Sequence, residues 1–333
     1  MGLKDKIKAV ADAIRSKTGK TAKLTLDQMR TEIGELGKKV TVDGVDVDKE
    51  LNLKTKGYIW DDPASFNYRY YSFTSCVVFN DKLHWFFNNQ HYTVSPGGGT
   101  SFIGSAPNSN NSYSPTAVVF NGMIYYMGTY ASSTSDDGYT YCYRWDGKVW
   151  TKVCQMPYKF SHGHAVEYRN AIYIFGNGNT AFASDNYLYR LDGSKWTKVS
   201  GLPIDYMIDC AYVVWNDKIN VFGNYESDHW KSSFAWNGSS WESLISAPYS
   251  CFGGAAFVID GKIHLLGGSN SDSDRKRHYM LENNTWVMLK DMNGYLQFQP
   301  AVVYKDAIYA FGTYSIENYH PYLFMCEKLF GYA

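Results

Sequence analysis

The sequence lacks an excess of charge of either sign, because its 32 basic and 32 acidic residues cancel. Without a net field to attract a polyanion, neither nucleic-acid binding nor steering to a membrane surface is predicted. It also lacks an apolar run of the roughly 18 residues needed to cross a bilayer. The start, Met1 to Lys6, has no hydrophobic signal core, and Lys6 breaks the myristoylation pattern. We therefore expect synthesis in a cytoplasm and no membrane insertion.

Paired cysteine motifs are also missing, since the six cysteines are widely spaced and form no Cys-x-x-Cys pair. Without a signal peptide, such cysteines are predicted to be reduced and mostly buried, rather than joined in disulfides or bound to metal. His162-Gly163-His164 invites a metal interpretation, but no third ligand follows at a usable spacing. We expect a structural role for these histidines, with no metal and no cofactor. The cysteines are Cys76, Cys142, Cys154, Cys210, Cys251 and Cys326.

Aromatic residues, in contrast, are abundant: 29 Tyr, 18 Phe and 10 Trp stand against only 19% charged residues. This composition favours a sheet-rich protein, because aromatic side chains suit a pleated, half-buried surface. The 333 residues are enough for one large domain or two modest ones.

A hairpin-like unit recurs six times and is the strongest signal in the sequence. Each unit has a short apolar run, a two-residue turn such as Asn121-Gly122 or Asp260-Gly261, and a second apolar run that usually ends in Gly. Such turn residues tolerate the positive φ angles of a tight hairpin. The units start at Phe79, Phe120, Tyr168, Trp215, Ile259 and Tyr304, so they are 41, 48, 47, 44 and 45 residues apart.

A second hairpin follows in four units and ends in Trp150, Trp196, Trp241 or Trp286. Two hairpins per unit give four antiparallel strands, which form one propeller blade, and six units predict an all-β, six-bladed ring. The first unit has Pro96 to Gly99 where its second hairpin would begin, so the pattern does not define its outer strands. The last unit has little room for a fourth strand. Either Tyr58–Trp60 or Cys326–Phe330 could supply it.

A hairpin ending in Gly followed by a hairpin ending in Trp resembles the Kelch repeat, and the likeness covers most of the chain. It implies a Kelch-type propeller over residues 58–333. Only Gly267-Gly268 preserves the double glycine of that family. Galactose oxidase shares this type of propeller, but no residue here can be assigned to its copper site.

The first 57 residues follow a different pattern. Residues 1–38 read as two short amphipathic helices, the second opened by a capping box at Thr25 and Gln28, and residues 39–57 as a linker or a small hairpin. Helices this short need a partner. They could pack on the propeller, but we favour attachment to another subunit or self-association into a homo-oligomer. The attachment residues are Leu3, Ile7, Val10, Ile14, Leu26, Met29, Ile33 and Leu36.

The stretches Ala11–Gly19 and Leu24–Met29 also resemble the N-terminal segment of tail, baseplate and fibre proteins of phages and prophages. This resemblance implies a virion protein that is anchored at its N-terminus and displays its propeller.

Strand geometry predicts the binding surface of the propeller. The tight turns lie on one face, and the long blade-to-blade connections and long loops within blades lie on the other. These long segments carry aromatic side chains among polar ones, a composition that suits sugars and protein interfaces alike. Alternatively, many of these aromatics simply fill the junctions between blades. The candidate ligand-binding residues are Tyr68, Arg69, Tyr70, Tyr113, Tyr130, Tyr158, His162, Asp205, Tyr206, Tyr225, Trp230, Tyr249 and Tyr295.

From these patterns we expect a non-enzymatic display protein that binds a host surface glycan or protein. A structural decoration or assembly protein that contacts other virion subunits is the first alternative. The second is a polysaccharide depolymerase, in which two of the loop carboxylates Asp205, Asp209, Glu226 and Asp228 would act as a catalytic pair.

Overall fold

The computed structural model describes Asp12 and residues 41–42, 45–46, 53–60, 64–65, 74–87, 90–95, 99–107, 115–127, 141–158, 160, 163–176, 185–205, 207–224, 229–268, 271–298, 300–305, 307–312 and 322–332. The chain divides into a unit of Met1–Gly57 with Lys328–Ala333 and a unit of Tyr58–Glu327. The two predicted helices lie outside the described residues, apart from Asp12. In the described part of residues 39–57, β1 (Thr41–Val42) pairs with β2 (Val45–Asp46) around Asp43-Gly44.

Six sheets form the unit of Tyr58–Glu327, and each of the first five is a meander of four antiparallel strands. Blade 1 contains β5 (Ser75–Phe79), β6 (Lys82–Phe87), β7 (Gln90–Val94) and β8 (Thr100–Ser105). Blade 2 contains β9 (Thr116–Phe120), β10 (Met123–Met127), β11 (Tyr141–Trp145) and β12 (Trp150–Gln155). Blade 3 contains β13 (His164–Tyr168), β14 (Ala171–Phe175), β15 (Tyr187–Asp192) and β16 (Lys195–Gly201).

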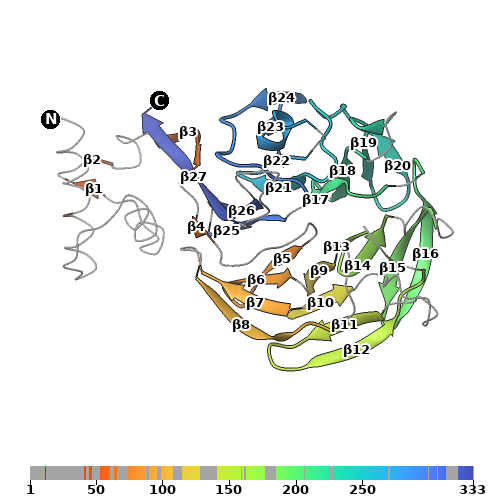
Figure 1. Ribbon diagram of the computed structural model, residues 1–333. Helices are drawn as coiled ribbons and strands as arrows, with labels where there is room; N and C mark the ends of the chain where they lie inside the picture. Colours follow the sequence, from red (N-terminus) through yellow and green to blue (C-terminus); the bar gives the residue numbers. More distant parts are fainter. Residues whose placement is uncertain are drawn as a thin grey trace. The chain divides into compact units, whose positions relative to one another are not determined.

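The remaining blades follow the same order (Figure 1). Blade 4 contains β17 (Ala211–Trp215), β18 (Lys218–Phe222), β19 (Ser233–Trp236) and β20 (Trp241–Ser243). Blade 5 contains β21 (Ala255–Ile259), β22 (Lys262–Leu266), β23 (His278–Glu282) and β24 (Thr285–Met288), with the 3-10 helix η2 (Asp274–Lys276) before β23. Blade 6 contains β25 (Ala301–Tyr304), β26 (Ala307–Gly312), β27 (Tyr322–Tyr332) and β3 (Leu53–Trp60), and β4 (Ala64–Ser65) also pairs with β27.

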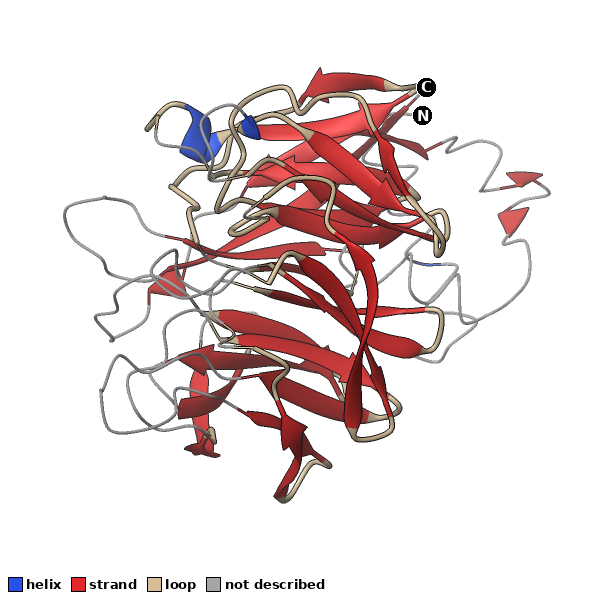
Figure 2. Cartoon of the chain, turned by 90° about the vertical axis from the view of Figure 1, so that its right-hand side faces the viewer, coloured by secondary structure: helices blue, strands red, loops and turns tan. Residues whose placement is uncertain are grey.

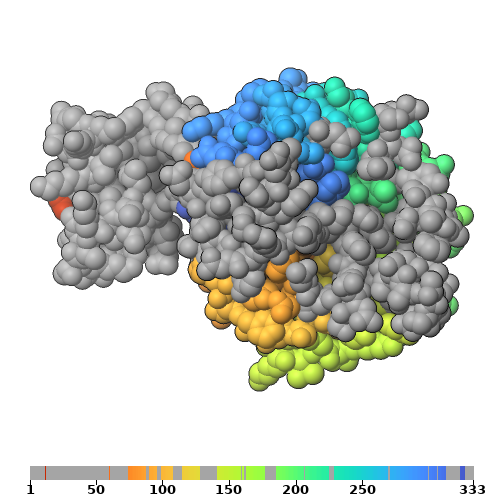
Figure 3. All heavy atoms as spheres, viewed as in Figure 1, coloured from red at the N-terminus to blue at the C-terminus, as the bar shows by residue number. Residues whose placement is uncertain are grey.

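The innermost strands β5, β9, β13, β17, β21 and β25 contact one another in sequence, and β25 contacts β5, so the ring of blades is closed. The colours of the space-filling view follow the same circuit, from orange through green to blue (Figure 3). Strands dominate the described residues in the perpendicular view (Figure 2). Among the described residues, no helix is both long enough and apolar enough to cross a membrane.

The six tight turns between the first two strands of each blade lie where the repeat predicts them. Their described non-glycine residues have φ between 46° and 59°, as in Asn216 and Asp217, so the turn residues adopt the left-handed backbone that Asn and Asp tolerate. The six-bladed, all-β architecture predicted from the repeat is therefore confirmed.

The structure answers two questions about strands that the sequence left open. Blade 1 does have both outer strands, β7 and β8, and the Pro96–Gly99 stretch falls between them. In blade 6, Cys326–Phe330 belongs to the third strand, β27, and Tyr58–Trp60 belongs to the outermost strand, β3. The sixth blade is thus completed by a strand from the N-terminal side of the chain.

The core lies between neighbouring blades, where the second and third strands bury large side chains. One such cluster joins blades 6 and 1 through Trp85, Tyr92, Phe311 and Leu323. Another packs Trp60 against blades 5 and 6, next to Leu296 and Phe324. All six cysteines are free thiols, and five of them are buried, as predicted, whereas Cys154 is partly exposed.

Candidate binding site at the mouth of the channel

A cavity of about 280 Å³ lies on the ring axis, at the end where the blade-to-blade connections reach the innermost strands. This end of the ring, opposite the tight turns, is called the connection face below. All six blades contribute to the cavity. Its lining residues fall within 74–76, 115–117, 163–164, 209–212, 253–256 and 298–302.

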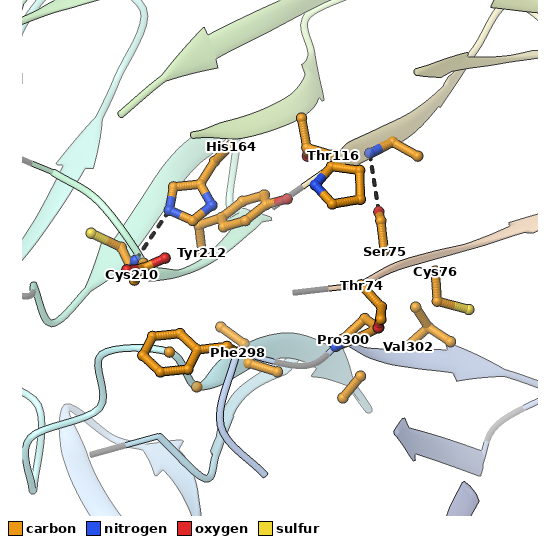
Figure 4. Close-up of a pocket in the computed structure, with 18 of the residues that line it drawn as sticks. Thr74, Ser75, Cys76, Thr116, His164, Cys210, Tyr212, Phe298, Pro300 and Val302 are labelled. Atoms are coloured by element: carbon orange, nitrogen blue, oxygen red, sulfur yellow. Dashed lines mark hydrogen bonds between the residues drawn. The ribbon is translucent and has the colours of Figure 1, made fainter. Parts of the chain in front are cut away.

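The side chains around the cavity combine polar and aromatic groups. Figure 4 shows His164, Tyr212 and Thr116 on one side, across from Phe298 and Pro300 on the other. Burial raises the pKa of the Tyr212 phenol, although hydrogen bonds with Thr116 and with the Ala165 backbone oppose that rise. The phenol is therefore neutral at physiological pH, and the rim presents hydroxyl groups and ring faces.

Hydrogen bonds between neighbouring blades hold the rim of the cavity together. The Ala117 backbone N–H donates to Ser75 Oγ at 3.0 Å, and the Cys210 N–H donates to His164 Nε2 at 3.1 Å. A backbone chain continues around the ring, from the Gly253 N–H to the Asp209 carbonyl at 2.5 Å and from the Phe298 N–H to the Gly253 carbonyl at 2.6 Å. The rim is thus cross-braced by hydrogen bonds that join neighbouring blades, from the innermost strands and from the connections before them.

The backbone is strained at two points of this rim. Among the described residues, thirteen non-glycine positions have positive φ, and eleven of them belong to hairpin turns. The other two are Asp209, with φ of 52°, and Phe298, with φ of 57°, and both line the cavity. A left-handed conformation costs about 1–3 kcal/mol for a bulky residue such as Phe298, whereas Asp209 tolerates it better, and strain of this kind concentrates at ligand-binding and catalytic sites.

Asp209 is the single charged residue among the described residues that line the cavity. Glycoside hydrolysis requires two carboxyl groups, so this lining alone does not supply a catalytic pair. The described residues also contain no group of three or more His, Cys, Asp or Glu side chains that could hold a metal ion. His164 already accepts a backbone hydrogen bond, which is the structural role predicted for it.

The structure places five of the predicted ligand-binding residues, and none of them lines the cavity. Tyr158 and Tyr249 are only 6% and 5% exposed. Each hydroxyl donates a 2.8 Å hydrogen bond to a glycine carbonyl 18 residues later, at Gly176 and Gly267. These two tyrosines therefore fill blade junctions, which is the alternative role considered for the loop aromatics.

The other three placed residues lie nearer to solvent. Asp205 is exposed, accepts a hydrogen bond from Asn186, and its backbone carbonyl accepts one from Asn224 at 3.3 Å. Trp230 is 38% exposed, and Lys276 Nζ lies 4.4 Å from the ring centroid of Tyr295. The remaining candidates lie outside the described residues: Tyr68, Arg69, Tyr70, Tyr113, Tyr130, His162, Tyr206 and Tyr225.

Loss of either buried hydroxyl is expected to weaken the fold without affecting the cavity. Tyr158→Phe and Tyr249→Phe should each lower the free energy of unfolding by about 1–2 kcal/mol, because a buried glycine carbonyl loses its donor. Chemical denaturation measures this cost. Tyr187→Phe, at an exposed site, is the matched control, and an equal loss in the control would contradict the structural role.

The cavity-lining residues were hard to select from the sequence, because most have small side chains that form no recognisable functional motif. Their common feature is position, since each lies within three residues of the first residue of an innermost strand. The repeat locates those strands, so alignment of the six units would have singled out Asp209 and His164 as rim residues.

Comparison with known proteins agrees with the architecture. No family model matches the sequence, and no curated protein matches it. Among solved structures, the chain is similar to the one titled "Structure of YjhT", with a TM-score of 0.64 and 10% sequence identity over 80% of this chain and 98% of that chain. The fold is a six-bladed β-propeller. At this identity the likeness concerns the fold alone.

Proposed function

We propose that this chain is an attachment protein of a phage or phage-derived particle. Its N-terminal segment docks it onto other particle subunits, and its propeller binds a host surface glycan or protein through the connection face. The observation that carries the proposal is the cavity at the channel mouth, with its strained, cross-braced rim. The resemblance of the N-terminal stretch to virion proteins supplies the context.

The lining of the cavity favours a neutral sugar unit as the bound group. Its volume is at the low end for small-molecule sites, which suits one sugar ring or one side chain rather than a large ligand. Asp209 would repel an anion, while it can accept hydrogen bonds from sugar hydroxyls. Phe298 offers an aromatic face against which the C–H groups of a sugar can stack.

We also propose that the propeller is of the Kelch type. The double glycine of that family, present here as Gly267-Gly268, has φ angles of 63° and 86°. A Cβ atom at Gly267 would lie 2.5 Å from the Leu296 backbone oxygen, and one at Gly268 would lie 2.7 Å from the Cys251 backbone oxygen. Glycine is therefore required where the end of β22 meets the neighbouring connections, which gives the family signature a packing reason in blade 5.

The proposal predicts that the full chain, multimerised to raise its avidity, binds intact host cells and competes with adsorption of the particle. Binding would be measured by flow cytometry with labelled protein, and its ligand class by a glycan array that contains neutral and acidic sugars. If the folded protein fails to bind while particles lacking it adsorb normally, the attachment role is wrong. A loss of particle assembly in its absence would instead support a structural decoration protein.

A further inference from the structure

Blade 2 contains a pair of cysteines that the proposed function does not use. Cys142 on β11 and Cys154 on β12 are direct partners in the antiparallel register, so their side chains project from the same face of the sheet. Directly opposed residues in antiparallel strands have Cα atoms about 4.5–5.5 Å apart, which lies within the range that a disulfide can bridge. Both side chains also belong to the same hydrophobic cluster, in which Cys142 is buried and Cys154 partly buried.

The repeat shows that the fold does not require cysteine at these positions. The register shifts immediately after Cys142, and the same shift follows His91 in blade 1 and Leu188 in blade 3. The residue pairs equivalent to Cys142–Cys154 are therefore His91–Gly104 and Leu188–Ser200. The shift in strand register therefore forms with three different residue pairs. Of these three blades, only blade 2 has cysteine at both positions.

The two thiols differ in their access to solvent. Cys142 is completely buried, with its Sγ 3.6 Å from Met127 Sδ, whereas Cys154 is partly exposed. The Cys142 thiol hydrogen-bonds to Cys154 and thereby lowers the pKa of Cys154, against the effect of burial. The pKa of Cys142 is raised by the same hydrogen bond and by burial. A partly exposed thiol of lowered pKa thus lies beside a buried one, the arrangement of an attacking and a resolving cysteine.

We propose that Cys142 and Cys154 form a redox-modifiable pair, which hydrogen peroxide oxidises to a cross-strand disulfide. The Cys154 thiolate attacks the peroxide, forming an S–O bond while the O–O bond breaks and hydroxide leaves as water. Cys142 then attacks the sulfur of the Cys154 sulfenic acid, so that the S–S bond forms, the S–O bond breaks, and a second water leaves with the proton of Cys142. Two thiols lose two electrons to one hydroperoxide, and no other reactant is needed.

The other four cysteines serve as internal controls for the oxidation of the blade 2 pair. Cys76, Cys210, Cys251 and Cys326 are all buried. Burial raises the pKa of Cys210 well above its ordinary value and that of Cys251 to about 12. These thiols are expected to stay reduced in the folded protein under conditions that oxidise the blade 2 pair. The inference does not depend on what the propeller binds.

Peptide mapping of the full chain tests the proposal directly. The folded protein is treated with a small molar excess of hydrogen peroxide, the remaining thiols are blocked, and the chain is digested with trypsin. Cleavage after Lys82, Arg144, Lys152 and Lys159 puts Cys142 in peptide 83–144 and Cys154 in peptide 153–159, each with one cysteine. We expect these two peptides to be disulfide-linked, two of the six thiols to be lost, and both to return with a thiol reductant.

Two variants separate the roles of the cysteines. Cys154→Ser should retain all its remaining thiols at the same peroxide dose, whereas Cys142→Ser should accumulate a sulfenic acid at Cys154 that dimedone traps. Cys76→Ser, at a buried site in blade 1, should still form the link. The proposal is overturned if the wild-type protein keeps all six thiols at a dose that oxidises a reference dithiol peptide. It is equally overturned if the linked peptides contain other cysteines.

Discussion

Acidification from pH 7.5 to pH 5 is expected to lower the free energy of unfolding by about 4–6 kcal/mol. The cause is two buried histidine pairs at equivalent positions of blades 1 and 5. His84 Nδ1 lies 2.8 Å from His91 Nε2, and His264 Nδ1 lies 2.9 Å from His278 Nε2. In each pair one ring donates and the other accepts, so protonation of both rings would leave no acceptor and break the hydrogen bond.

The direction of the effect follows from proton binding in the two states. Burial lowers the pKa of His84 to about 4 and that of His91 to about 3, and it lowers the pKa of His278 well below its ordinary value. Below pH 6.5 the unfolded chain binds protons that the native chain excludes, so stability falls as pH falls. Each such histidine costs about 1.4 kcal/mol per pH unit until the native state protonates. Above about pH 7.5 these groups contribute little slope, because the unfolded chain then binds few protons at histidine.

Urea denaturation at pH 5, 6 and 7.5 measures this slope. The double variant His264→Asn/His278→Gln should have a visibly smaller slope, since it removes one pair. Asparagine is a suitable replacement, because Asn220 occupies the equivalent position in blade 4 and satisfies its amide with the Trp215 and Lys218 carbonyls. A wild-type stability that is constant between pH 7.5 and pH 5 would contradict the account. The ion-paired Asp217, whose pKa Arg169 lowers, titrates below this window.

Truncation of Trp60 is expected to cost about 3–5 kcal/mol, the range for removing a buried tryptophan side chain. Trp60 ends the outermost strand of blade 6 and is 3% exposed. Its carbonyl accepts a 3.2 Å hydrogen bond from Asn293 Nδ2, and its ring meets the ring of His278 edge-on at 5.8 Å. Trp60→Ala would therefore leave a cavity where the strand that completes blade 6 packs against blade 5.

Thermal unfolding measured by near-ultraviolet circular dichroism tests this cost, which corresponds to a melting temperature lower by roughly 6–15 °C. Phe102→Ala removes a large aromatic side chain from β8, where it is 58% exposed, and is the matched control. A Trp60→Ala variant as stable as the control would mean that β3 does not complete blade 6 in solution.

Local chemistry explains why most of the fold could be predicted from the sequence. The turn residues, such as Asn216-Asp217, define the first hairpin of every blade, and the apolar runs beside them define the innermost strands. Completion of blade 6 was harder to predict, because two segments from opposite ends of the chain competed for the place of its fourth strand. Pairing between residues far apart in sequence decides that question, and no local signal encodes it.

The candidate site was less predictable, since aromatic content does not distinguish a ligand contact from a junction filler. Tyr158 and Tyr249 have the composition of a binding residue, yet their hydroxyl groups bind glycine carbonyls inside the protein. Conversely, Asp209 and Phe298 are marked by their backbone conformation, which only the folded ring imposes. The connection face was foreseeable from strand order, whereas the residues around its cavity were not.

The measurement that tests the central claim most directly is host-cell binding by two matched variants of the full chain, Asp209→Asn and Asp205→Asn. Both residues lie between β16 and β17, but only Asp209 lines the cavity, and asparagine tolerates its φ of 52°. The account predicts that Asp209→Asn binds about 10- to 100-fold more weakly, as expected for loss of a charge-assisted hydrogen bond, while Asp205→Asn binds like the wild type. Unchanged binding by Asp209→Asn, or a loss confined to Asp205→Asn, would contradict it.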